Sequence, residues 1–157
     1  MAFFSILFIS GNKDEIAKMS EMVHSACPSL EIKKAASGKE AFFLLKECRK
    51  ENRPAAIIID YMLPDIKGLE FFRIIIESEK YRDIPILIMS GTYIEPGDRA
   101  DVLFAGAAGF IQKPDFSKSV SKENMCPWGE SFCRELAYQL KLPYGKLCTE
   151  HAGDKEE

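Results

Sequence analysis

The 157-residue sequence carries little excess charge, no long apolar run and only two histidines. Its 21 basic and 24 acidic side chains give a formal net charge of -3, so it lacks the basic excess that is typical of nucleic-acid binders. No apolar stretch approaches the ~20 residues that a membrane-spanning helix requires. We therefore predict a protein that binds neither nucleic acid nor a membrane.

Paired cysteines and a secretory leader are also missing. The five cysteines show no repeated spacing, which favours reduced thiols over a disulfide framework. The apolar opening, residues 1–9, has no basic leader and no small-residue cleavage pattern, so we interpret it as a first strand. Both features predict a cytoplasmic location.

What the chain does contain is a regular alternation of strand and helix patterns. Short apolar runs that suit buried strands alternate with segments whose apolar residues recur at helical spacing. The expected strands are 5–10, 30–32, 55–60, 84–89 and 110–112, with helices between them that begin near Asn12, Gly38, Gly68 and Asp98. This order predicts an α/β fold, a doubly wound five-stranded parallel sheet with helices on both faces, of the flavodoxin type.

The pattern weakens after residue 115. Residues 116–124 are polar and are expected to form a loop, and apolar residues at four-residue steps from Trp128 to Leu140 then predict a final amphipathic helix. We assign residues 1–142 to one domain and residues 143–157 to a flexible C-terminal tail.

Four polar side chains end the predicted strands. They are Ser10, Asp60, Ser90 and Lys113. Ligands and chemistry gather at the carboxyl ends of strands in open parallel sheets, so we expect these side chains to meet there.

The segment that begins at Asp60 has the spacing D-x3-P-x3-G, completed by Pro64 and Gly68. Ser90 follows thirty residues after Asp60, and Lys113 precedes a proline after a short strand. In spacing and strand context the chain resembles the response-regulator receiver (CheY-like) family over residues 4–114.

The resemblance implies a signalling domain rather than an enzyme. It implies that Asp60 accepts a phosphoryl group from a histidine kinase, that Lys113 and Ser90 contact that group, and that Phe110 is the aromatic switch. It also implies a cis peptide bond before Pro114. In the family, Mg²⁺ is bound by two adjacent acids after the first strand, by the acceptor aspartate and by a backbone carbonyl, here that of Met62.

The sequence departs from the family where the adjacent acids should stand, because it has Ser10 and Gly11. Mg²⁺ relies on one or two carboxylates to be retained, and only Asp60 and the Met62 carbonyl remain. Asp14 is expected to lie one turn into the first helix and away from the site. We therefore predict that Mg²⁺ binds weakly or not at all.

Two functions follow from these observations, and a third is weaker. The first is a stand-alone receiver-like domain of two-component type that is degenerate in Mg²⁺ binding and acts through protein contacts. The alternative is a working phosphoacceptor regulator modified on Asp60. The third is small-ligand binding at the loop 10–13. In the first two, the resemblance implies that the partner, a histidine kinase or an effector, binds the face made by the fourth helix, fifth strand and final helix. Our candidates on that face are Tyr93, Phe104, Phe110 and Trp128.

Overall fold

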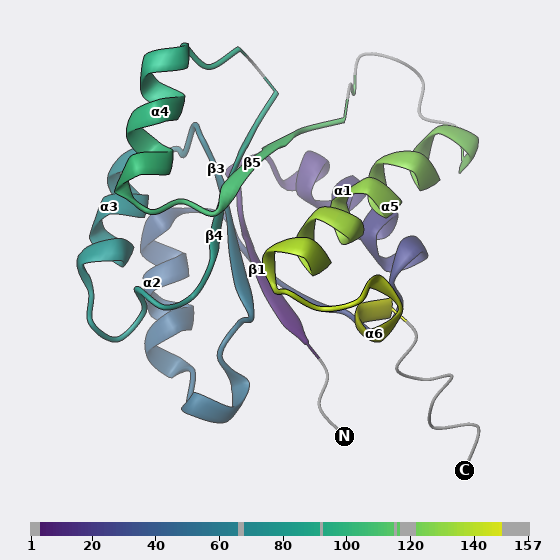
Figure 1. The fold of residues 1–157 in the computed structure, drawn as a ribbon, viewed down its shortest axis with the longest axis horizontal. Coiled ribbons are helices and arrows are strands. Elements are labelled where there is room, and N and C mark those ends of the chain that lie inside the picture. The colour runs from purple at the N-terminus through teal and green to yellow at the C-terminus, as the bar shows by residue number, and fades with distance from the viewer. Residues whose placement is uncertain (1–3, 66–67, 92, 115, 117–121, 149–157) are drawn as a thin grey trace.

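The computed structural model describes residues 4–65, 68–91, 93–114, 116 and 122–148. Five parallel strands form one sheet in the order β2-β1-β3-β4-β5 (Figure 1). The strands are β1 Ser5–Ile9, β2 Glu31–Ala35, β3 Ala56–Asp60, β4 Ile86–Ser90 and β5 Gly109–Gln112. The predicted fold class and the order of its elements are confirmed.

Helices cover both faces of the sheet (Figure 1). The cluster that contains Ile16 and Phe132 packs α1 and α5 against one face, and the cluster that contains Leu45, Phe72 and Val102 packs α2, α3 and α4 against the other. The helices are α1 Lys13–Ala26, α2 Gly38–Glu47, α3 Gly68–Glu77, α4 Pro96–Ala105, α5 Lys122–Gln139 and α6 Tyr144–Cys148, with a short 3-10 helix at Lys50–Asn52. No described helix is both long enough and apolar enough to cross a membrane.

The starts of α1 and α2 are held by side-chain caps. The Asn12 side chain accepts a hydrogen bond from the Glu15 N–H at 3.0 Å, as the sequence predicts. Ser37 caps α2 in the same way, at 3.1 Å. Asp65 adds a second cap, because its two carboxylate oxygens accept the N–H groups of Gly38 and Lys39 at 3.0 Å each. The loop after β3 is therefore attached to the first turn of α2.

The C-terminal part differs from the sequence prediction in two places. Helix α5 begins at Lys122 and continues through Pro127, where the apolar pattern indicates a helix only from Trp128. Residues 144–148 form α6 rather than a flexible tail, because the Leu147 side chain, 1% exposed, joins the core. Residues 149–157 of the predicted tail lie outside the described residues.

Candidate functional site

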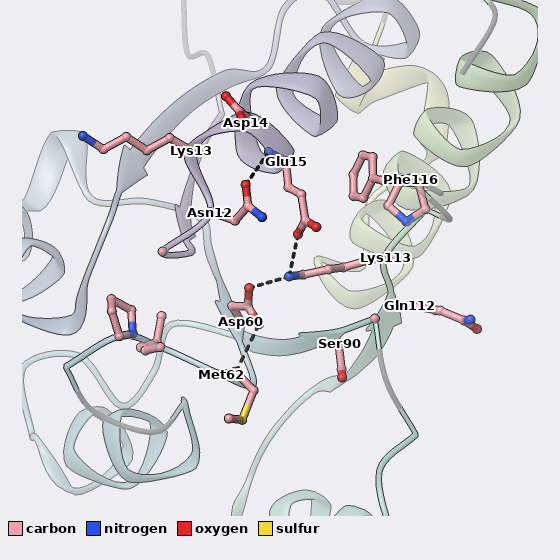
Figure 2. A pocket seen from close by; sticks show the side chains of 15 residues that line it. Asn12, Lys13, Asp14, Glu15, Asp60, Met62, Ser90, Gln112, Lys113 and Phe116 are labelled. Carbon is pink, nitrogen blue, oxygen red and sulfur yellow. Dashed lines mark hydrogen bonds and ion pairs between the residues drawn. The ribbon is translucent and has the colours of Figure 1, made fainter. Parts of the chain in front are cut away.

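A pocket of about 1160 Å³ lies at the carboxyl ends of the strands (Figure 2). Its wall includes the loop after β1, the end of β3, the end of β4 and the segment after β5. The four strand-end residues are therefore brought to one edge of the sheet, as expected for parallel strands. They are Ser10, Asp60, Ser90 and Lys113.

Asp60 is the buried centre of this site, with 7% of its side chain exposed. Its Oδ2 atom accepts hydrogen bonds from Lys113 Nζ at 2.5 Å and from Ser10 Oγ at 2.9 Å. Its Oδ1 atom accepts the Met62 N–H at 3.1 Å. A buried carboxylate needs such partners, because an uncompensated charge is costly to remove from water.

The loop after Asp60 returns tightly to the strand end. The Gly68 N–H donates to the Tyr61 carbonyl at 3.0 Å. A Cβ atom at position 68 would overlap the Asp60 carbonyl oxygen, so the position requires glycine. This contact gives the last residue of the D-x3-P-x3-G spacing a structural reason.

Lys113 follows β5 and connects two acids from distant parts of the chain. Its Nζ atom lies 2.5 Å from Asp60 Oδ2 and 3.0 Å from Glu15 Oε1, and only 11% of its side chain is exposed. Burial acts to lower the pKa of Lys113, but the hydrogen bonds and charges of Asp60 and Glu15 outweigh it, so the pKa is raised above 10.5. The ammonium is therefore held in its charged form.

Glu15 is the site residue that the sequence prediction missed. Its position three residues after Asn12 indicates only a helix-capping role. In the structure its carboxylate extends from the first turn of α1 to Lys113, whereas Figure 2 shows Asp14 pointing away from Lys113. Asp14 therefore points away from the site, as the sequence predicts, but the next residue, Glu15, reaches it.

The remaining predicted site residues have mixed outcomes. Ser90 lines the same pocket, and Figure 2 shows its side chain directed away from the Asp60 carboxylate. Phe110 is half-buried, and the Arg99 guanidinium of α4 lies 5.0 Å from its ring centroid.

The bond before Pro114 is not cis, since no cis peptide bond occurs among the described residues. That prediction is wrong for this structure, where the trans form that X–Pro bonds ordinarily prefer is found.

The surface candidates also separate into two groups. Tyr93 and Phe104 are exposed, Phe104 by 96%. Trp128 is half-buried instead, because its indole N–H donates to the Gln112 carbonyl at 2.8 Å and its ring stacks on Phe132. Its place on the face that a partner binds stays a prediction.

This arrangement is matched by a known family. Residues 6–122 match the response regulator receiver domain. The chain belongs to the response regulator receiver domain family. It is similar to the "Two-component response regulator ORR1" of Oryza sativa subsp. indica, with 32% identity over 122 residues. That match covers 76% of this chain and 52% of the rice protein, so this receiver domain spans about half the length of that relative.

Solved structures support the same fold for the receiver domain. The chemotaxis response regulator CheY4 of Vibrio cholerae aligns with a TM-score of 0.64 and 21% identity, over 85% of this chain and 99% of that one. The Mn²⁺-bound form of response regulator Rcp1 aligns with a TM-score of 0.67 and 17% identity, over 89% of this chain and 99% of that one. Identities this low establish the fold alone.

Membership in the family carries a general function. Receiver domains are the signalling domains of two-component response regulators, and they interact with histidine kinases and effectors. They commonly bind Mg²⁺ or Mn²⁺ at their acidic pocket.

Proposed function

We propose that this receiver domain signals through protein contacts and that Asp60 is phosphorylated slowly or not at all. The observation that carries the proposal is the neutral hydroxyl that lies beside Asp60 where the family has a carboxylate. Ser10 Oγ donates to Asp60 Oδ2 at 2.9 Å, and Gly11 follows it without a side chain. The pair of acids that would hold a metal ion next to Asp60 is therefore missing.

The donor set does not fit a resident Mg²⁺ ion. Mg²⁺ requires near-octahedral oxygen ligands at about 2.0–2.1 Å and is held in proteins by one or two carboxylates. Asp60 and the Met62 carbonyl are the donors that the family pattern leaves, and Ser10 offers a neutral hydroxyl already bonded to Asp60. The Glu15 carboxylate is bound to the Lys113 ammonium, which lies between it and Asp60. Among the residues that the structure describes, no three histidine, cysteine or acidic side chains are grouped to hold a metal ion.

Position 11 also has no room for the missing acid. A Cβ atom on Gly11 would lie 2.8 Å from Pro64 Cδ and 3.0 Å from Pro64 Cγ. Pro64 belongs to the loop that follows Asp60, and its ring is rigid. Any side chain at position 11 therefore needs this loop to move.

Weak metal binding would slow phosphorylation for an electrostatic reason. A phosphoryl group brings about two negative charges to a carboxylate that is itself an anion, and preorganised cations stabilise that charge in phosphoryl transfer. Lys113 supplies one positive charge, which Asp60 shares with Glu15. Among the described residues, Lys113 is the cation that is bonded to Asp60, and its single charge balances only part of this negative charge.

The face that includes α4 offers a surface for a protein partner. Phe104 is 96% exposed, and Tyr93 and Leu103 are exposed nearby in the chain. Large exposed apolar side chains gathered in one region mark interaction sites. Phe104→Asp is expected to weaken binding of a kinase or effector roughly tenfold or more. Phe43→Asp, which changes an exposed phenylalanine of α2, is the matched control and is expected to leave binding unchanged.

A working phosphoacceptor is the second candidate, and one observation favours it. Lys113 Nζ lies 2.5 Å from Asp60, so the acceptor and the cation that would contact a phosphoryl group are already together. Ligand binding at residues 10–13 has no comparable support. The Ser10 hydroxyl and the Asn12 amide oxygen are both used in internal hydrogen bonds.

One experiment separates the first two candidates. The protein is incubated with acetyl phosphate and Mg²⁺ and its intact mass is measured, with Asp60→Asn as the control. We expect little or no added phosphoryl group. Stoichiometric addition that disappears in Asp60→Asn would overturn the proposal and establish the phosphoacceptor function instead.

A further inference from the structure

The contact between Glu15 and Lys113 has no assigned role. It joins the first turn of α1 to the segment after β5, across 98 positions of the sequence, at 3.0 Å. The Glu15 side chain is 27% exposed, so this ion pair is only partly screened by water. Through this contact the Glu15 carboxylate binds the ammonium of Lys113, the cation next to Asp60.

Glu15 does not make the helix-capping hydrogen bond that its position favours. An acid at this position of a helix commonly accepts the N–H of the N-cap residue, which is Asn12 here. Instead, the Asn12 N–H donates to Ser10 Oγ at 3.3 Å, and the Glu15 carboxylate extends to Lys113. Ser10 therefore takes over the capping contact that would otherwise engage Glu15.

The charges of the site then sum to one negative. Lys113 lies between the Asp60 and Glu15 carboxylates, and both pairs are close enough to be hydrogen-bonded (Figure 2). An incoming oxyanion must compete with Glu15 for the ammonium, and it is also repelled by the Glu15 charge.

We propose that Glu15 is a built-in anion that occupies Lys113 and must be displaced before Lys113 can bind the oxygens of a phosphate-like group. Glu15 is thus a positioning residue that acts through Lys113. The inference rests on the proposed function in one respect, that Lys113 is the cation that an incoming phosphoryl group would meet beside Asp60. It adds that a carboxylate of the same chain, that of Glu15, competes with such an anion for Lys113.

The test measures binding of inorganic phosphate by the wild type, Glu15→Gln and Asp14→Asn. Trp128 is the single tryptophan of the chain and bonds to the Gln112 carbonyl, next to Lys113, so its fluorescence reports on the site. Phosphorus-31 NMR of the titrated phosphate gives a second measurement. Asp14→Asn is the matched control, because it removes the same charge from an exposed neighbour that points away.

We expect Glu15→Gln to bind phosphate roughly tenfold more tightly than the wild type, the size of effect expected for one charge at short range. Asp14→Asn should change the affinity by less than about twofold, as a screened surface charge does. Adding Lys113→Met to Glu15→Gln should remove the gain. Circular dichroism verifies that each variant is folded.

Three results would overturn the inference: equal changes in Glu15→Gln and Asp14→Asn, no phosphate binding by Glu15→Gln in either measurement, or a gain that survives Lys113→Met. None of them depends on covalent phosphorylation. The acetyl phosphate experiment therefore tests the proposed function separately, and either idea can fail while the other stands.

Discussion

The indole N–H of Trp128 donates to the Gln112 carbonyl across 2.8 Å, and this bond ties α5 to the end of β5 one residue before Lys113. The Trp128 ring also stacks on Phe132, with ring centroids 5.4 Å apart. Phe132 in turn contacts Phe8 of β1 at the same separation. A row of three aromatic rings therefore runs from α5 into the core.

Trp128→Phe should lower the free energy of unfolding by about 0.5–1.5 kcal/mol, because it removes this hydrogen bond and keeps an aromatic ring. Urea denaturation followed by circular dichroism measures the change. Tyr138→Phe alters an exposed ring of the same helix and should have no effect. Equal stability of Trp128→Phe and the wild type would show that the bond contributes nothing.

Gly129→Ala should destabilise the protein by about 1–3 kcal/mol, the usual cost of overpacking. A Cβ atom at position 129 would overlap the Met22 carbonyl oxygen, so α1 and α5 must move apart. Gly97→Ala is the control, since a Cβ atom there meets nothing within 4 Å, and alanine stabilises a helix relative to glycine. Opposite signs for the two variants are expected in urea denaturation, and matching signs would contradict the packing argument.

Ser10→Asp should raise the affinity for Mg²⁺ by roughly tenfold or more, because it places a second carboxylate beside Asp60. Without metal the variant should be less stable than the wild type, since two like charges then share a buried site. Isothermal titration calorimetry measures the first effect and thermal unfolding the second. Ser10→Asn, which is neutral and similar in size to the aspartate, should give no gain in affinity and a smaller loss of stability, because it overpacks the buried position without adding a charge. An equal gain in affinity from both variants would argue against the charge explanation.

The ion pair between Arg53 and Asp83 predicts a dependence of stability on pH. The hydrogen bond from Arg53, at 2.8 Å, lowers the pKa of Asp83 below its usual 3.8. Because the folded pKa is the lower one, the stabilisation is present above pH 3.8 and is lost as the pH falls through the folded pKa. Asp83 is largely exposed, so Asp83→Asn should cost less than about 1 kcal/mol at pH 7.

A double-mutant cycle with Arg53→Met isolates this pair from the other bond that Arg53 makes, to the Lys80 carbonyl. The coupling energy from urea denaturation should be favourable at pH 7 and should approach zero below the folded pKa of Asp83. A coupling that stays constant across this range would rule out the ion pair as its source.

The sheet and the centre of the site could be predicted because their signals are local. A buried parallel strand is a continuous apolar run, and the residue that ends it, such as Asp60 or Ser90, falls at the same edge as its neighbours. The ion pair of Glu15 could not be predicted in this way. Its partner is 98 positions away, and its helix position already had an ordinary explanation as a cap.

The structure also differs from the sequence prediction at α6 and at the start of α5, where the local sequence pattern gives little signal. Helix α6 has five residues, too few for a periodic pattern, and depends on tertiary contacts such as the burial of Leu147. The start of α5 falls in residues 116–124, whose polar sequence indicates a loop, and Pro127 is a residue that ordinarily marks a helix boundary. At α6, contacts with the loop that follows α1 decide the structure.

One carbonyl holds α6 in place. The Leu147 oxygen accepts hydrogen bonds from Cys27 Sγ at 3.1 Å and from Ser29 Oγ at 3.0 Å. Both donors precede β2, so these bonds hold α6 at the end of the sheet where the strands begin. Asp60 lies at the opposite end, where the strands finish. Surface immobilisation through an affinity handle placed beyond Cys148 would hold the molecule by its far edge and leave the pocket open to a soluble partner.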